Sequence, residues 1–214
     1  MDEDFELFLR ALPAHERRTY PTSAKIQHFE GRLPKLLLQY WIEHGWGGFG
    51  NGMFWIVNPD EFKGVLETWC QNVPGTEDAY VIGRSAFGEL MVWKTGHGKF
   101  MRIVPLEHTI YTFPPNKHVK AGKEDFSLGG LISRINLEML DFEDEHEKPL
   151  FKRAVKKLGI VGQDEMYAFE PALSLGGTAR LDSLVRLKLE EHLHFLAELG
   201  EAQVIHVDTT RFAK

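Results

Sequence analysis

The sequence predicts an α+β fold in which an antiparallel meander is flanked by N-terminal and C-terminal helices. Three observations support this prediction. Apolar residues at helical spacing open the chain, four segments rich in β-branched and aromatic residues follow between residues 80 and 113, and helical spacing returns after residue 126. Gly88 and the turn Gly96-His97-Gly98 separate strands of the central group, as is typical of a meander.

The first element is a short amphipathic helix whose apolar face is formed by Phe5, Phe8, Leu9 and Leu12. Pro13 ends this helix because proline lacks the amide that a helix interior requires. Residues 14–32 are polar and have no apolar period, so they are predicted to be irregular.

The stretch at residues 33–61 organises the N-terminal half of the chain. Pro34 stands where a first helical residue tolerates proline, and Gly45 is predicted to stop the helix that follows. The run WGGFGNG after it is predicted to be a glycine loop that its aromatic rings fix to the core. Residues 53–57 are predicted to form a strand, and an Asx side chain of the turn Asn58-Pro59-Asp60 is predicted to cap a helix over residues 61–69.

The meander and the segment boundary come next. Pro105 predicts a bend or an edge position late in the meander. Residues 114–125 have no apolar period, so the sequence is divided into a segment at 1–125 and a mostly helical segment at 126–214, packed together as one compact unit. The four predicted strands are Tyr80–Ser85, Glu89–Lys94, Lys99–Val104 and Glu107–Phe113.

The second segment is predicted to contain one helix over residues 128–139 and another that starts at Pro149 and ends at Gly159. A short strand is predicted at residues 164–169. Residues 182–199 fit a helix, although three alternating apolar residues in this range also fit a strand, so both interpretations stay open. Residues 204–206 are predicted either to add an edge strand or to fray.

Composition limits the function classes. The chain has 214 residues, a formal charge of −6 and one cysteine, Cys70, so an internal disulfide is excluded and a reducing compartment is favoured. The acidic start and the lack of a long apolar run predict a cytoplasmic protein without a membrane partner. Net acidity argues against direct nucleic-acid binding and is compatible with a basic protein partner.

Four sequence features could indicate chemistry, and each has a simpler structural explanation. The spacing Gly45-x-Gly47-x-x-Gly50 matches a dinucleotide fingerprint, but the order helix, glycines, strand is the reverse of what that site needs. His192 and His194 point to different sides of a helix, and Cys70 fits a core thiol. Carboxylate pairs such as the one at residues 60–61 fit helix caps. No catalytic residue, cofactor or metal is therefore predicted.

Two long motifs resemble known bacterial families. The run GWGGFGNGMFWIVNPDEF resembles the GAD-like domain, and the run PLFKRAVKKLGIVGQDEMYAFEPALSLGG resembles the C-terminal domain of type VI secretion immunity proteins. The resemblance implies an immunity protein that binds and silences a secreted DNase toxin in the producing cell. The wider group is similar to the SUKH superfamily, which implies a curved sheet with helices.

Exposed acidic residues near apolar loops are the predicted contacts for that toxin, since a nuclease must be positively charged where DNA lies. A SUKH-type regulatory or scaffolding module that binds another protein is the alternative, and a hydrolase with paired carboxylates is a weaker one. The predicted partner-binding residues are Glu143, Asp144, Glu145, Glu147, Asp164 and Glu165.

Overall fold

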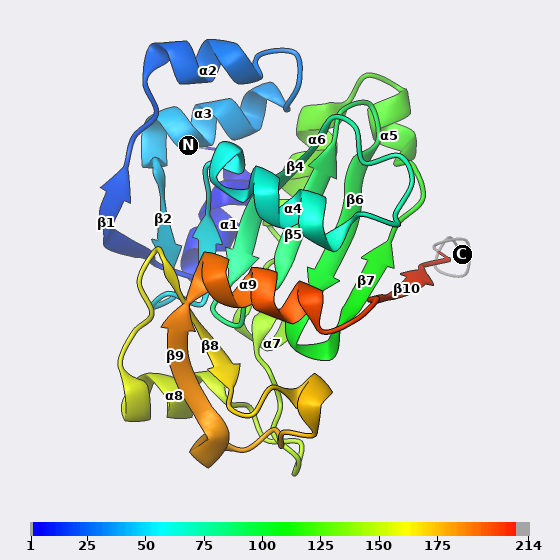
Figure 1. Ribbon diagram of the computed structural model, residues 1–214. Helices are drawn as coiled ribbons and strands as arrows, with labels where there is room; N and C mark the ends of the chain where they lie inside the picture. Colours follow the sequence, from blue (N-terminus) through cyan, green and yellow to red (C-terminus); the bar gives the residue numbers. More distant parts are fainter. Residues whose placement is uncertain (1, 209–214) are drawn as a thin grey trace.

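The computed structural model describes residues 2–208 and confirms the predicted α+β fold class (Figure 1). Within this range an eight-stranded open sheet has the order β1-β2-β3-β4-β5-β6-β7-β10, and β8 pairs with β9 in a separate antiparallel hairpin. The strands are β1 (Ala14–Thr19), β2 (Trp46–Phe49), β3 (Phe54–Ile56), β4 (Ala79–Ser85), β5 (Leu90–Lys94), β6 (Gly98–Val104), β7 (Thr109–Thr112), β8 (Glu165–Phe169), β9 (Leu184–Lys188) and β10 (Gln203–His206).

Helices cover both faces of the large sheet. α4 and α9 pack against each other in front of the strands in Figure 1, and α6 packs against α1, α3 and β6 behind them. The α-helices are α1 (Glu3–Ala11), α2 (Ser23–Phe29), α3 (Lys35–His44), α4 (Lys63–Trp69), α5 (Lys117–Lys120), α6 (Glu124–Ile132), α7 (Leu137–Leu140), α8 (Phe151–Leu158) and α9 (Leu189–Glu198). The 3₁₀ turns are η1 (Pro59–Phe62), η2 (Pro105–Glu107), η3 (Leu173–Leu175) and η4 (Leu181–Ser183).

Most predicted elements occur where expected. α1, α3, β3 and the four strands of the meander are present, and the side chain of Asn58 caps η1 by accepting the amide of Asp60. η2 begins at Pro105, which confirms the predicted bend before β7. Residues 182–199 contain both elements that the sequence left open, since β9 leads directly into α9.

Three predictions about local structure were wrong. Residues 14–32 contain β1 and α2, because the backbone of β1 pairs with β2 even though its side chains lack an apolar alternation. The expected glycine loop begins as β2, which is paired on both sides and buried. The expected helix over residues 128–139 is split into α6 and α7, and Met139 is exposed.

The two glycines that flank β2, Gly45 and Gly50, lie where the chain approaches its neighbours closely. Gly45 has φ +70 and ends α3, and a Cβ there would lie 2.8 Å from the carbonyl oxygen of Thr19. At Gly50, φ is +58 and a Cβ would lie 2.4 Å from Leu12 Cδ2. These two glycines of the apparent fingerprint therefore occupy close-packed turns between α1, β1 and β2, consistent with the predicted structural role.

β10 is the edge strand of the large sheet next to β7. It pairs in parallel with β7, from Gln203 opposite Thr109 to His206 opposite Thr112. This is the edge strand that the sequence left open against fraying. β10 belongs to the predicted second segment and therefore adds a strand to the sheet of the first segment. The segment boundary at residue 125 itself stays a prediction.

Candidate partner-binding site

The predicted acidic residues fall into two groups at opposite ends of the β8–β9 hairpin. Asp164 precedes β8, where Glu165 pairs with Lys188. The loop 143–147 contacts the chain before β9, because the amide of Glu145 donates to the carbonyl of Ala179 at 2.9 Å. Four residues of an extended strand span about 13 Å, so the structure does not bring the two groups together.

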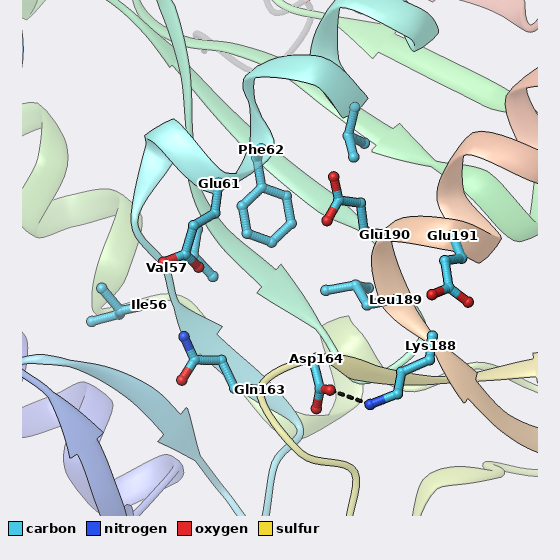
Figure 2. A pocket seen from close by; sticks show the side chains of 11 residues that line it. Ile56, Val57, Glu61, Phe62, Gln163, Asp164, Lys188, Leu189, Glu190 and Glu191 are labelled. Carbon is cyan, nitrogen blue, oxygen red and sulfur yellow. Dashed lines mark hydrogen bonds and ion pairs between the residues drawn. The ribbon is translucent and has the colours of Figure 1, made fainter.

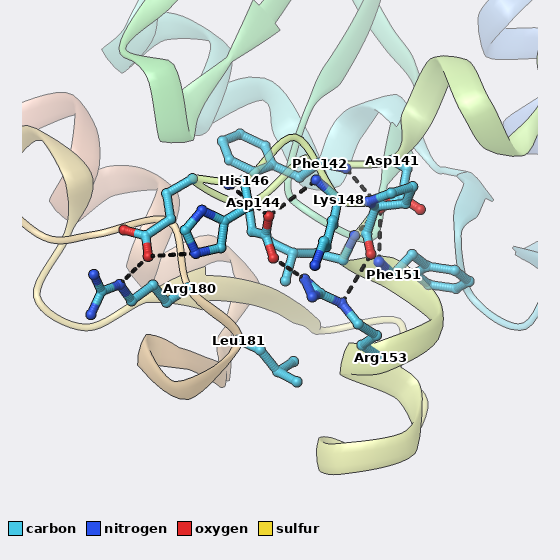
Figure 3. Close-up of polar contacts among 12 residues, drawn as sticks. Asp141, Phe142, Asp144, His146, Lys148, Phe151, Arg153, Arg180 and Leu181 are labelled. Atoms are coloured by element: carbon cyan, nitrogen blue, oxygen red, sulfur yellow. Dashed lines mark hydrogen bonds and ion pairs between the residues drawn. The ribbon is translucent and has the colours of Figure 1, made fainter.

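Asp144 holds its own loop together (Figure 3). Its side chain is only 8% exposed and accepts the amides of His146 at 2.9 Å and Lys148 at 3.0 Å. Arg153 of α8 donates to the other carboxylate oxygen at 2.5 Å. Hydrogen bonds from these amides and the charge of Arg153 lower the pKa of Asp144. The prediction that Asp144 is an exposed partner contact is therefore wrong about its exposure, because its oxygens face inward.

The neighbouring acids of the loop differ from one another. Glu145 lies 2.5 Å from Arg180 Nε and 3.6 Å from His146 Nε2, so its carboxylate is paired within the protein. Glu143 and Glu147 are exposed. Only these two side chains of the loop are open to a partner without first breaking an internal ion pair.

Asp141 is the residue of this loop that sequence reasoning missed. One of its carboxylate oxygens accepts the amides of Phe142 at 2.8 Å, Leu150 at 3.1 Å and Phe151 at 2.7 Å (Figure 3). Leu150 and Phe151 begin α8, so Asp141 caps this helix from nine residues upstream. A capping residue so distant in sequence gives no local signal, because the usual pattern places it next to the helix.

We expect Asp141→Ala to lower the free energy of unfolding by about 2 kcal/mol, because the amides of Phe142 and Phe151 lose their acceptor. The amide of Leu150 keeps the carbonyl of Phe142, at 2.9 Å. Asp141→Asn keeps one acceptor oxygen and should lose less. Urea denaturation monitored by circular dichroism measures both variants. Asp182→Ala is the matched control, since that carboxylate is fully exposed and lies 3.8 Å from Lys157; a loss as large as that of Asp141→Ala would contradict this role of Asp141.

The second acidic group borders a groove between the N-terminal and C-terminal parts of the chain (Figure 2). The groove has a volume of about 670 Å³. Its apolar lining comes from Ile56, Val57, Phe62, Val65 and Leu189, and its polar lining comes from Glu61, Gln163, Asp164, Lys188, Glu190 and Glu191. We call this the acidic groove, because four carboxylates and one lysine line it.

The charges of the acidic groove are largely open to solvent. Asp164 forms an ion pair with Lys188, and this contact lowers the pKa of the Asp164 carboxyl. Glu190 and Glu191 are exposed in the first turn of α9. Glu61 accepts a hydrogen bond of 3.2 Å from the side chain of Asn58. After the one lysine is matched with Asp164, three carboxylates remain above an apolar floor.

Arg84 fixes the loop that supplies Asp164. It lies in β4, is 1% exposed, and donates from Nη2 to the carbonyls of Gly162 and Gln163, each at 2.8 Å. Its guanidinium lies 4.6 Å from the ring centre of Trp55. Burial lowers the pKa of Arg84 to about 9, while the charges of Asp164 and Glu165 act in the opposite direction. Arg84 is therefore still a cation at neutral pH.

Glu165 lies on the inner side of this loop. Its carboxylate accepts the amide of Gly162 at 2.8 Å and lies 3.4 Å from Arg186 Nε. It therefore orders residues 162–165, whereas Asp164 faces the acidic groove (Figure 2). Of the two predicted acids in this group, Asp164 is the one placed to meet a partner.

The remaining sequence features have structural roles. Cys70 is buried, and burial raises its pKa to about 12, which makes its thiol a poor nucleophile. On α9, the His194 ring lies 3.0 Å from Thr68 Oγ1 and the His192 ring packs near Phe195. Across residues 2–208, no group of three or more His, Cys, Asp and Glu side chains could hold a metal ion.

None of the helices in the described part of the chain has the length and apolar character needed to cross a bilayer. This finding agrees with the helix lengths given above, since the longest helices among residues 2–208 have ten residues.

Two family models match successive parts of this chain. The model of the GAD-like domain matches residues 3–107, and the model of the C-terminal domain of the T6SS immunity protein Tdi1 matches residues 127–200. The predicted boundary at residue 125 lies between the two matched ranges. All of the acidic groove lining after residue 160 belongs to the second range, and the apolar floor of the groove belongs mainly to the first.

A solved structure, that of Atu4351 from Agrobacterium tumefaciens, has a similar fold. The TM-score is 0.87 at 22% sequence identity, and the match covers 97% of this chain and 94% of that chain. At this identity the similarity shows the fold alone. A search of curated proteins found no match. The chain therefore matches the GAD-like domain and then the Tdi1 C-terminal domain, and the second match supports a type VI secretion immunity protein.

Proposed function

We propose that this protein binds and neutralises a cognate type VI secretion DNase toxin in the cytoplasm of the producing cell. The observation that supports this proposal is the acidic groove, which presents Glu61, Asp164, Glu190 and Glu191 around an apolar floor. A DNase carries positive charge where it holds DNA phosphates. An acidic surface attracts such a partner from a distance, and an apolar floor supplies the burial that slows its release.

The proposed inhibitor acts by binding and needs no cofactor or catalytic residue. Its contact surface is centred on the acidic groove, with Asp164 as the predicted acid that contributes directly. Glu143 and Glu147 are exposed at the other end of the β8–β9 hairpin and would be reached only by a partner that extends along the hairpin. Asp144, Glu145 and Glu165 act by holding the loops in place.

Co-expression with the toxin encoded by the adjacent gene tests the function itself. We expect the two proteins to co-purify as a complex, and we expect the complex to lack the DNA-degrading activity of the toxin alone. An adjacent product that degrades DNA equally well with and without this protein would contradict the proposal. If the toxin is bound and inhibited but degrades no DNA on its own, only the assignment of DNA as its substrate would be wrong.

The double variant Glu190→Lys/Glu191→Lys tests the acidic groove. We expect the association rate with the toxin to fall on the order of tenfold at low salt, because the change removes the electrostatic attraction. The difference should shrink at high salt, where the Debye length is short. Surface plasmon resonance at two ionic strengths measures both effects.

Glu3→Lys/Glu6→Lys is the matched control for the groove variant. Both pairs of glutamates lie in the first turn of a helix, so both variants change the net charge equally and lose the same kind of helix-end stabilisation. α1 lies behind the sheet in Figure 1, away from the acidic groove. Equal association rates for the two variants would show that the toxin binds elsewhere.

A further inference from the structure

A second groove of opposite charge lies beside α5 and α6. Its volume is about 750 Å³, and its lining includes the basic side chains of Lys99, Lys117, His118 and Arg134 and the rings of Phe113 and Phe126. We call this the basic groove. No carboxylate is part of its lining. In a chain with a formal charge of −6, such a concentration of positive charge is a local feature of the tertiary structure.

Two of the cations are free to bind a partner. Lys117 and Arg134 are exposed, and neither lies within 4.0 Å of a carboxylate among residues 2–208. The acids nearest to Lys117 in the sequence, Glu124 and Asp125, begin α6, and Asp125 accepts the amide of Leu36. The acid nearest to Arg134 in the sequence, Glu138, lies in α7 and is not part of the groove lining. The positive charge of the groove is therefore not neutralised by its neighbours.

Aromatic rings accompany these charges. The Phe126 side chain is 65% exposed, and its ring lies 4.9 Å from the ring of His118 in an edge-on arrangement. Lys99 Nζ lies 4.0 Å from the ring centre of Phe113, and burial lowers the pKa of this lysine. An exposed phenylalanine in a monomeric protein leaves apolar area in water unless another molecule covers it.

We propose that the basic groove binds an acidic peptide segment that carries an apolar anchor. The carboxylates of such a segment would pair with Lys117 and Arg134, and its apolar side chain would cover Phe126. A peptide fits better than a nucleic acid, because a polyanion longer than the groove would meet the net negative charge of the rest of the surface. α6 lies behind the sheet in Figure 1 and α9 lies in front, so this surface is separate from the acidic groove.

Gly130 provides a way to block the groove without disturbing the fold. This residue lines the groove within α6, and a Cβ at this position would meet no atom within 4 Å. Gly130→Leu therefore places a side chain in the open space. Replacement of glycine inside a helix also favours the helix, so the melting temperature should not fall.

Fluorescence anisotropy with a labelled synthetic peptide, Ac-Glu-Asp-Phe-Glu-Asp-Leu-Glu-Asp-NH₂, tests the proposal on the full chain. We expect saturable binding that weakens roughly tenfold in Lys117→Glu/Arg134→Glu, since rim and groove charges control this kind of recognition. Phe126→Ser and Gly130→Leu should also weaken binding at an unchanged or higher melting temperature. Lys120→Glu/Lys123→Glu is the control with the same change in net charge outside the lining.

Three results would overturn the proposal. The first is no saturable binding of the acidic peptide, and the second is equal binding of a peptide with lysine in place of every acid. The third is tighter binding of an eight-nucleotide oligothymidine than of the acidic peptide, which would identify the groove as a nucleic-acid site. None of these measurements involves the toxin, so their outcome is independent of the proposed immunity function.

Discussion

Arg84→Ala is expected to lower the free energy of unfolding by about 3–5 kcal/mol, because it removes a buried cation whose partners remain buried. The carbonyls of Gly162 and Gln163 each lose a hydrogen bond of 2.8 Å, and the Trp55 ring loses the guanidinium that covers it. Equilibrium urea denaturation measures the loss. Hydrogen exchange should also speed up over residues 159–165, because Arg84 joins this loop to β4 of the large sheet.

Two further variants separate the parts of this effect. Arg84→Lys keeps the charge but has no planar fork with which to bond both carbonyls, so it should recover only part of the stability. Arg10→Ala is the control for loss of an exposed arginine, since the Arg10 side chain is 76% exposed and lies 3.8 Å from Glu6. A loss for Arg84→Ala as small as that for Arg10→Ala would contradict the anchoring role.

Arg84 also connects stability with the proposed toxin surface. The loop that it holds supplies Gln163 and Asp164 to the acidic groove. If this loop loosens, the groove loses its fixed shape before the whole protein unfolds. We therefore expect Arg84→Lys to weaken toxin binding at temperatures where the variant is still folded.

The second large effect is a dependence of stability on pH through Glu89. This residue precedes β5 beside a small cavity of about 110 Å³ that Arg102, Glu107 and Asp141 also line. Burial raises the pKa of Glu89 to about 7, although Arg102, 3.7 Å away, and Lys99 act in the opposite direction. The folded protein therefore favours the protonated form of this carboxyl more than the unfolded chain does.

The sign of the effect follows from proton binding. Between the ordinary pKa of 4.5 and the folded pKa of about 7, the folded state binds the proton more tightly than the unfolded state does. The contribution to stability is complete below pH 4.5 and is lost as the pH rises through 7. A shift of this size corresponds to about 3 kcal/mol.

Glu89→Gln isolates this contribution, because it keeps the shape and removes the titration. We expect the wild-type protein to lose about 3 kcal/mol relative to Glu89→Gln between pH 4.5 and pH 7.5. Urea denaturation of both proteins across this range measures the difference, in which other titrating groups largely cancel. A difference that stays constant with pH, or that grows in favour of the wild type as pH rises, would contradict the assignment.

Local sequence patterns predicted elements whose apolar residues follow one clear period. α1 and α3 have this property, as do the strands of the meander, and Gly45 and Pro105 mark ends that the structure confirms. Local sequence patterns failed to predict secondary structure where hydrogen bonding between backbones, and not the spacing of apolar side chains, determines the element. β1 has the sequence AHERRT, which is polar after its first residue, and it is a strand because β2 offers it a hydrogen-bonding edge.

The acidic groove was predicted only in part. Asp164 was identified as a contact, whereas Glu61 was interpreted as part of a carboxylate pair at a helix cap, and Glu190 and Glu191 were not predicted to contact a partner. Both outcomes are locally reasonable, since these glutamates do lie in first turns. Their second property, a shared groove, depends on α9 packing against α4, where Trp69 Nε1 donates to the carbonyl of Leu193 at 3.0 Å.

The sequence by itself determined the α+β class, the order of most elements, the resemblance to the GAD-like domain and to a type VI secretion immunity domain, and the acidity of the chain. Only the tertiary structure decided which charges are available to a partner. It turned Asp144 inward onto two amides and Arg153, and it gathered Glu61, Asp164 and Glu190 from distant segments into one groove. Periodicity and capping act over a few residues and can be read along the chain. Charge clustering depends on contacts between residues more than a hundred positions apart, and those contacts are fixed only when the helices pack on the sheet.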